Sequence, residues 1–351
     1  MKSILFLFCL LGPVAALAVD PNEGLITKFM TAWFPAMKDA EITLEAKESG
    51  PGFFLYYAKF GPKDKKGGDT QPLIYLPNKK TILVGDYFNL SKFKDQAVDM
   101  KFIGTFLSNA IGASTKAVEL PSKPDLPEFD VAQETGYGKV HYKGWLFGKV
   151  HLLIGKAYAI DDDPRQLRMK EVNVKMGGAL GDPAAPNKLY VFLDLECPFC
   201  AKLEKDLIPL LKERKDWQAV FFQFPLTIGH PISFKAAGAA HCFLAQNPRL
   251  YFDFMEWFYP QRADVDLSSI DSTCYGFAEM HGLEEPFLGC YMKEKNIQSV
   301  LDSMQMALDA GVRFTPTAYV NGSVYGPWDL MALLKPPAAA EGAPTTGEKK
   351  E

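Results

Sequence analysis

The chain has 351 residues and a formal net charge of −4, with 38 lysines and arginines against 42 aspartates and glutamates. This mildly acidic balance argues against a nucleic-acid partner and against an anionic membrane surface as a target. The length exceeds that of a typical single domain, so we expect two domains. The sequence contains neither a P-loop nor a G-x-G-x-x-G motif, and we expect no metal, nucleotide or flavin cofactor.

Residues 1–18 have the features of a secretory signal peptide. Lys2 supplies a short positive region, residues 4–11 are apolar, and Ala16-Leu17-Ala18 resembles a small-x-small cleavage site. The apolar run is too short to span a bilayer comfortably. We therefore expect a periplasmic or secreted protein in a compartment where disulfides form. The C-terminal residues do not form an ER-retention signal, which favours the bacterial periplasm.

Residues 19–100 are predicted to form an α+β domain, because one segment with helical periodicity precedes several strand-like segments. The turn sequence Pro77-Asn78-Lys79-Lys80 separates two short apolar runs and predicts a β-hairpin. The predicted elements are a helix over 24–38 and strands over 42–46, 53–60, 73–76 and 81–84.

Residues 101–180 have a less regular pattern. Residues 100–111 predict a helix, three prolines between 121 and 127 predict a loop, and residues 138–160 predict two or more strands. This region is either a β-rich connector or an extension of the first domain.

From residue 181 to residue 335 the pattern changes to β-α-β, which predicts an α/β domain with parallel strands and a right-handed crossover. Residues 336–351 are rich in proline, alanine and glutamate and are predicted to be a disordered tail. The predicted elements of this α/β domain are a strand over 188–194, a helix over 201–215 kinked at Pro209, a strand over 219–224, a helical insert over 232–310, a hairpin around Asn321-Gly322 and a helix over 328–334.

The sequence Cys197-Pro198-Phe199-Cys200 lies between the first of these strands and the helix. A helix N-terminus stabilises a thiolate through unpaired N–H groups and its dipole, and the thiolate is the reactive form. Cys200, one turn further on, can resolve a mixed disulfide. Half of a zinc site and two buried structural cysteines are the competing interpretations. A second C-x-x-C and a histidine pair with ligand spacing are both absent from the sequence, so we predict a redox-active disulfide.

Thr315-Pro316 stands at the start of the last hairpin. The order of strand, C-x-x-C, helix, strand, helical insert, Thr-Pro, hairpin and helix resembles a thioredoxin fold with a helical insertion, as in the periplasmic Dsb thiol–disulfide oxidoreductases. The segments that carry the resemblance are 191–200, 224–242 and 311–317.

This resemblance implies roles for four residues. Cys197 would be the exposed nucleophile and Cys200 the buried resolving thiol. Pro316 would be cis and face the cysteine pair, and Thr315 would present its backbone to a substrate strand.

Features of the sequence disagree on whether the chain isomerises or oxidises disulfides. The threonine before Pro316 and the N-terminal α+β domain resemble the isomerase-type DsbC and DsbG proteins, and the latter resemblance implies dimerisation. The long helical insert resembles the oxidase DsbA instead. Pro198-Phe199 contains neither the histidine of DsbA nor the Gly-Tyr of DsbC. Without a basic residue between the cysteines we expect a moderately lowered Cys197 pKa, which favours an isomerase or a reductase.

We therefore expect a thiol–disulfide isomerase or oxidoreductase that acts on unfolded or misoxidised secreted proteins. Its other expected partners are a membrane redox protein and a second copy of the chain. The alternatives are a non-catalytic holdase or adaptor, and a dedicated disulfide reductase of one partner protein.

Charged residues near the cysteines have two interpretations. Asp194 and Glu196 precede the pair, and strand alternation places them on one face. They either tune the pKa values and move protons, or are solvated charges at the strand end. Arg313 is either a partner of the thiolate or a surface charge.

Three further cysteines, Cys242, Cys274 and Cys290, lie in or near the helical insert. We expect two of them to form a structural disulfide and prefer Cys242 with Cys290. Cys274 with Cys290, or three buried thiols, are the alternatives. Six aromatic residues between 251 and 259 are predicted to be helix core rather than a substrate-binding surface.

Overall fold

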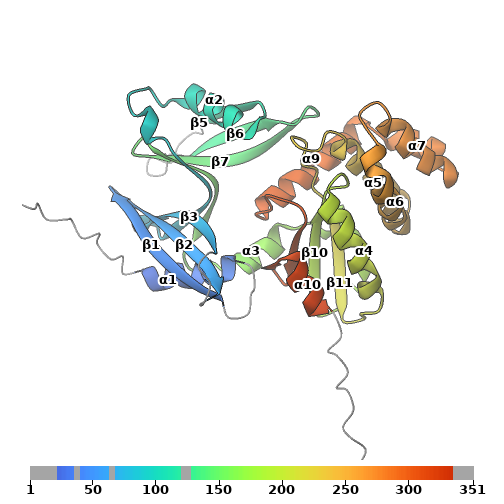
Figure 1. Ribbon diagram of the computed structural model, residues 1–351, viewed down its shortest axis with the longest axis horizontal. Helices are drawn as coiled ribbons and strands as arrows, with labels where there is room; N and C mark the ends of the chain where they lie inside the picture. The colour runs from blue at the N-terminus through green and yellow to red at the C-terminus, as the bar shows by residue number, and fades with distance from the viewer. Residues whose placement is uncertain (1–21, 35–39, 63–67, 120–127, 335–351) are drawn as a thin grey trace, which may run out of the picture.

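The computed structural model describes residues 22–34, 40–62, 68–119 and 128–334. An antiparallel sheet unit near the N-terminus lies beside an α/β unit rich in helices (Figure 1). The predicted signal peptide, the end of the first predicted helix and the predicted tail lie outside the described residues. Within the described part of the chain, no helix combines the length and the apolar character needed to cross a membrane.

One eight-stranded antiparallel sheet forms the N-terminal unit, in the order β1-β2-β3-β4-β8-β7-β6-β5. The strand β4 pairs with β8 over its full length, from Thr81 opposite Ala159 to Asn89 opposite His151. The strands after residue 100 are therefore an extension of the N-terminal sheet rather than a separate connector. The strands are β1 Ala40–Gly50, β2 Phe53–Pro62, β3 Asp69–Leu76, β4 Thr81–Asn89, β5 Thr115–Glu119, β6 Glu128–Glu134, β7 Lys139–Phe147 and β8 His151–Ala159.

Two helices cover parts of this sheet. Helix α1, Glu23–Trp33, buries one apolar face against β2, β3 and β4. Helix α2, Met100–Ile111, has the predicted bounds, because the Asp99 side chain accepts from the N–H of Phe102 at its start and Gly112 adopts a φ of 72° at its end. It packs its apolar face beside β5.

The second unit contains a five-stranded sheet of order β13-β12-β10-β11-β9. The predicted parallel pairing is confirmed between β10, Asn187–Leu193, and β11, Trp217–Gln223. The connecting helix α4, Pro198–Lys212, starts before the predicted 201, because Pro198 occupies its first turn. The remaining elements are α3 Pro164–Glu171, β9 Gly178–Gly181, β12 Thr317–Val320, β13 Ser323–Tyr325 and α10 Pro327–Leu334.

The predicted helical insert consists of five helices: α5 Ser233–Gln246, α6 Pro248–Gln261, α7 Ile270–Met280, α8 Glu284–Cys290 and α9 Glu294–Asp309. The aromatic residues of α6 lie in the hydrophobic core, with Trp257 partly buried against it. The structure contains the preferred disulfide, Cys242 to Cys290, with a Cα–Cα distance of 5.8 Å. Cys274 is a free, buried thiol.

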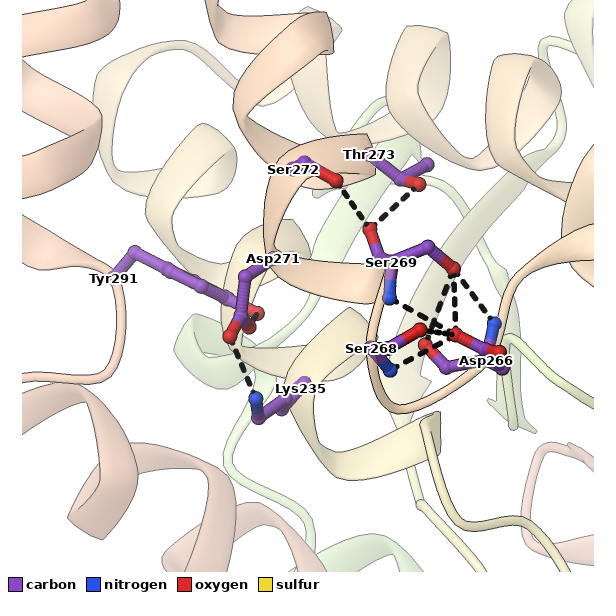
Figure 2. Close-up of polar contacts among 8 residues, drawn as sticks. All are labelled: Lys235, Asp266, Ser268, Ser269, Asp271, Ser272, Thr273 and Tyr291. Carbon is purple, nitrogen blue, oxygen red and sulfur yellow. Dashed lines mark hydrogen bonds and ion pairs between the residues drawn. The ribbon is translucent and has the colours of Figure 1, made fainter.

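Polar contacts reinforce the same helices (Figure 2). The Asp271 carboxylate accepts from Lys235 Nζ of α5 at 2.7 Å and from the Tyr291 hydroxyl, just after α8, at 2.8 Å. Asp266 accepts from the backbone N–H groups of Ser268 and Ser269 in the loop before α7. The Asp271 contacts connect α5, α7 and the end of α8.

Contacts between the two units occur along β7 and α9. Gln305 of α9 exchanges two hydrogen bonds with the His141 backbone, at 2.8 and 3.0 Å. The rings of Tyr137 and Phe234 stack with centroids 4.1 Å apart. The buried Arg168 guanidinium of α3 donates to the carbonyls of Trp33 and Gly322, which joins α1 to the β12–β13 turn. The N-terminal sheet is thus fixed against the second unit.

Candidate redox site

Cys197 is the N-cap residue of α4, and Cys200 lies in the first turn of that helix. Both are free thiols in the structure. The segment adopts this shape because the apolar β10 strand is buried and Pro198 has the backbone geometry of a first helical turn. The helix start directs the N–H groups of Phe199 and Cys200 toward the Cys197 sulfur.

The two thiols have opposite pKa shifts. The pKa of Cys197 is lowered to about 6, and the hydrogen bond from the Cys200 side chain is the largest cause. The N–H groups of Cys200 and Phe199 and a hydrogen bond from Thr315 lower it further. Burial opposes this shift. For Cys200, burial is the main cause of a pKa raised well above its usual value, and the nearby Cys197 raises it further. At neutral pH the site therefore favours a thiolate at Cys197 and a protonated thiol at Cys200.

The segment around Pro316 lies against the cysteine pair. The Thr315–Pro316 peptide bond is cis, and the Cys197 thiol donates to the Thr315 carbonyl at 3.7 Å. Cys197 is only 4% exposed, because the loop before β12 packs on its sulfur. The prediction of an exposed nucleophile is therefore wrong for the reduced state. Phe199 and Phe314, adjacent in sequence to these groups, are 71% and 64% exposed.

Asp194 connects the cysteine pair to the loop after β11. Its carboxylate accepts from the N–H groups of Glu196 and Leu226, at 2.8 and 2.7 Å, and contacts His230 Nδ1 at 2.7 Å. Its own backbone N–H donates to Cys200 Sγ at 3.5 Å. Asp194 is 1% exposed, which excludes the interpretation as a solvated strand-end charge.

Glu196 lies beside Asp194 and faces the start of α5. Its Oε2 accepts from the N–H of Ile232 at 2.9 Å, where the helix end favours negative charge. Burial is the main cause of its raised pKa. Both carboxylates thus bond to the segment between β11 and α5, and Asp194 is the one that also contacts the cysteine pair through its backbone.

His230 also belongs to the site, although no motif in the sequence indicates a role for it. The hydrogen bond to Asp194 is the main cause of its raised pKa, and the negative charge of Cys197 adds to the shift. Charge interactions are mutual, so the imidazolium also stabilises the Cys197 thiolate. His230 lies in the segment 224–242 that carries part of the resemblance. Its contact with Asp194, next to the cysteine pair, forms only on folding, because more than thirty residues separate the two in the sequence.

Glu204 is a second residue that the sequence did not indicate. It lies one turn after Cys200 on α4 and is buried. Burial, with a contribution from Glu256, raises its pKa to about 7. Its carboxyl group, one turn along α4 from Cys200, is therefore close to half protonated at neutral pH.

Arg313 does not act as a partner of the thiolate in this arrangement. Its guanidinium donates to the carbonyls of Leu308 and Val312, near the end of α9. Across the described residues no group of three or more His, Cys, Asp or Glu side chains is arranged to hold a metal ion.

We expect His230→Gln to raise the pKa of Cys197 above about 6, because the variant removes the positive charge that the thiolate faces. Alkylation of Cys197 by iodoacetamide at pH 6 should slow by about twofold or more, since only the thiolate reacts. The matched control is His281→Gln, which removes an exposed histidine at the end of α7. An alkylation profile that is the same in both variants would contradict the role given to His230.

Comparison with known proteins agrees with this arrangement. A family model described as Thioredoxin matches residues 173–335. The chain is 31% identical over 160 residues to the Na(+)/H(+) antiporter NhaA 1 of Mycobacterium sp. (strain KMS), a match covering 44% of this chain and 25% of that protein. The equivalent protein of Mycolicibacterium gilvum (strain PYR-GCK) is 27% identical over 167 residues, 46% of this chain and 26% of that protein. The chain thus spans about a quarter of the length of these curated relatives.

Three solved structures have a similar fold. Wolbachia pipientis alpha-DsbA1 is 18% identical, with a TM-score of 0.42, and the match covers 48% of this chain and 94% of that one. Bacillus subtilis BdbD is 20% identical, with a TM-score of 0.39 and coverages of 46% and 92%. The catalytic domain of Proteus mirabilis ScsC is 15% identical, with a TM-score of 0.41 and coverages of 48% and 95%. The Thioredoxin family match thus covers the part of the chain that contains the cysteine pair, the five-stranded sheet and the helical insert.

Proposed function

We propose that this chain is a thiol–disulfide oxidoreductase that isomerises disulfides in exported proteins through Cys197 and Cys200. One observation carries the proposal: Cys197 caps the N-terminus of α4 against the cis Thr315–Pro316 segment, and the buried Cys200 thiol lies one turn further along the helix. A nucleophilic thiolate with a retained second thiol is what disulfide exchange requires.

The reaction begins when the Cys197 thiolate attacks one sulfur of a substrate disulfide. A mixed disulfide forms and the other substrate sulfur leaves as a thiolate. If that thiolate attacks another disulfide of the substrate, and a substrate thiolate later displaces Cys197, the substrate is isomerised without net electron transfer. If Cys200 attacks Cys197 instead, the substrate leaves reduced and the Cys197–Cys200 disulfide remains.

The surroundings of Cys197 serve this chemistry. The Thr315 backbone, 3.7 Å from the sulfur, can pair with an extended substrate segment. The Asp194 carboxylate raises the pKa of His230 and so favours a positively charged imidazole near Cys197. Asp194 is thus a positioning residue, and the histidine has the electrostatic role that the cysteine motif itself lacks.

The degree of thiolate stabilisation supports isomerisation over oxidation. A pKa near 6 is closer to the value of about 7 in thioredoxin than to the value of about 3.5 in the strong oxidant DsbA. A less stabilised thiolate makes the Cys197–Cys200 disulfide a weaker oxidant, because the reduced form of the pair is less favoured, so net oxidation of a substrate is less favourable. A reduction potential close to the thioredoxin value of about −270 mV, with activity on one partner alone, would favour the dedicated reductase instead.

Location and partners are part of the proposal. The signal-like first residues support export to the periplasm or beyond, where misoxidised proteins are the available substrates. A membrane redox protein would then return the cysteine pair to its reduced state. The N-terminal sheet unit would join two copies of the chain.

We expect Cys197→Ser to abolish the recovery of active ribonuclease from its scrambled form, because serine cannot form the mixed disulfide. The assay compares the variant with the wild type in a glutathione buffer, alongside oxidation of fully reduced ribonuclease. Cys274→Ser is the control, since it removes a buried thiol of α7 that is not part of the cysteine pair and should leave isomerisation unchanged. Full activity of Cys197→Ser would support a holdase and exclude the proposed enzyme.

A further inference from the structure

A cavity of about 670 Å³ lies between helices α4 and α6 of the second unit. The two helices pack against each other (Figure 1), and Arg262, just after α6, completes the wall. The volume is within the range of pockets that hold small molecules. Neither Cys197 nor Cys200 is in the lining, so disulfide exchange gives this cavity no role.

Each of the two helices has an internal proline in the cavity wall, Pro209 in α4 and Pro260 in α6. A proline inside a helix has no N–H to donate to the carbonyl four residues earlier, and its ring abuts that carbonyl. The carbonyls of Lys205 and Glu256 therefore lose their usual helix partners, and both residues are in the lining as well. The two walls thus present backbone acceptors to the same space.

Two buried polar side chains also line the cavity. Tyr259 is 3% exposed, and its hydroxyl has no hydrogen-bond partner among the residues that the structure describes. Glu204 is 5% exposed, and burial followed by the charge of Glu256 raises its pKa, so the two carboxyl groups lie near each other. A buried hydroxyl without a partner is costly, and two neighbouring carboxylates repel each other. A cationic donor between these groups would relieve both effects.

The rim of the cavity is positively charged. Lys205 and Lys212 of α4 are in the lining and exposed. The Arg262 guanidinium is held beside them, because it donates to the Tyr259 carbonyl at 2.6 Å. The cavity therefore combines buried acceptors with cations at its edge. This is the complement of a molecule that has one cationic end and one anionic end.

We propose that the cavity between α4 and α6 binds a short zwitterionic peptide. The peptide ammonium group pairs with Glu204 and Glu256, and the peptide carboxylate pairs with the cations of the rim. The peptide N–H groups donate to the carbonyls that the two prolines leave free. Glu204 and Lys212 are separated by about 12 Å along the axis of α4. An extended tripeptide spans about 10 Å and matches this separation, whereas a single amino acid is too short.

Isothermal titration calorimetry of the full-length chain tests this site with the tripeptide trialanine. N-acetyltrialanine lacks the ammonium group, and trialaninamide lacks the carboxylate. Because each charged end has its own partners, removing either should weaken binding about tenfold or more. None of the three probes contains sulfur, so the outcome is independent of disulfide exchange. Equal affinities for the three probes, or no binding of trialanine, overturns the inference.

Two variants test the part played by the free carbonyls. Pro209→Ala and Pro260→Ala restore the N–H groups that bond to the carbonyls of Lys205 and Glu256. Each variant should bind trialanine about fivefold more weakly, because one peptide hydrogen bond loses its acceptor. The matched control is Pro248→Ala, since Pro248 occupies the first turn of α6, where a proline removes no helix hydrogen bond. The control should bind as the wild type does, and circular dichroism checks that each variant is folded.

The pH dependence of binding tests the part played by Glu204. Burial raises the Glu204 pKa to about 7, and the peptide ammonium group pairs with the ionised carboxylate. The affinity of the wild type should therefore rise about fivefold from pH 6 to pH 7, where the peptide amine is still protonated. The other titratable groups of the lining are Glu256, Tyr259, Lys202, Lys205, Lys212 and Arg262.

Glu204→Gln assigns this rise to one group. The variant should bind trialanine about tenfold more weakly than the wild type at pH 7 and should show no rise from pH 6. The matched control is Glu279→Gln, at an exposed glutamate of α7 outside the lining, and it should keep both the affinity and the rise. If folded Glu204→Gln and both proline variants bind as the wild type does, the peptide binds elsewhere and the inference is overturned.

Discussion

Cys200→Ser should convert the chain into a trap that stays covalently attached to its substrates. Cys197 keeps its helix N-terminus and the nearby His230, and the serine hydroxyl can replace the hydrogen bond from Cys200 that lowers the Cys197 pKa most, so Cys197 still attacks a substrate disulfide. Escape through Cys200 is lost, because serine cannot displace the sulfur of the substrate. An intramolecular thiol acts at a very high effective concentration, so the mixed disulfide should persist about a hundredfold longer or more.

Non-reducing electrophoresis and mass spectrometry of the full-length variant, incubated with scrambled ribonuclease, measure this persistence. The complex should disappear when dithiothreitol is added, and it should be absent from Cys197→Ser. Cys274→Ser serves as the matched control, because it removes a buried thiol of α7 that is not part of the pair and should form no lasting complex. Equal amounts of the complex in Cys200→Ser and wild type would contradict the role of Cys200 as the resolving thiol.

The local parts of the redox site could be predicted from sequence. The apolar run before Cys197 and the helical pattern after Cys200 placed the pair at a helix start, and the predicted parallel pairing of β10 with β11 is confirmed. These signals are local, since each depends on residues within a few turns of one another. For the same reason the bounds of α2, with its aspartate cap and terminal glycine, were predictable.

The charged surroundings of the cysteines could not be predicted in this way. His230 reaches Asp194 only because the loop after β11 folds back over the strand end, a tertiary contact that leaves no periodic pattern. The burial of Cys197 depends on the packing of the loop before β12 in the same sense. The extension of the N-terminal sheet beyond residue 100 could not be predicted either, because the pairing of β4 with β8 joins segments separated by α2 and three strands.

Replacing both Cys242 and Cys290 by alanine should lower the stability of the helical insert by about 4 kcal/mol, as an upper value from chain entropy. The disulfide spans a sequence separation of 48 residues and joins α5 to the end of α8. Without it, the unfolded segment gains the freedom that the crosslink had removed. The Asp271 contact with Lys235 in the same group of helices is partly exposed and contributes at most about 1 kcal/mol (Figure 2).

Hydrogen exchange followed by mass spectrometry of peptides from α5 and α8 measures this loss within the intact chain. A decrease of about 4 kcal/mol corresponds to about a thousandfold faster exchange through opening of the insert. Cys274→Ala in α7 is the matched control, because it removes a buried sulfur from the same group of helices without breaking a crosslink. Peptides from the N-terminal sheet should exchange at the wild-type rate in both variants. If the double variant and Cys274→Ala accelerate exchange to the same degree, the loss comes from packing, and the disulfide does not stabilise the insert by constraining its chain.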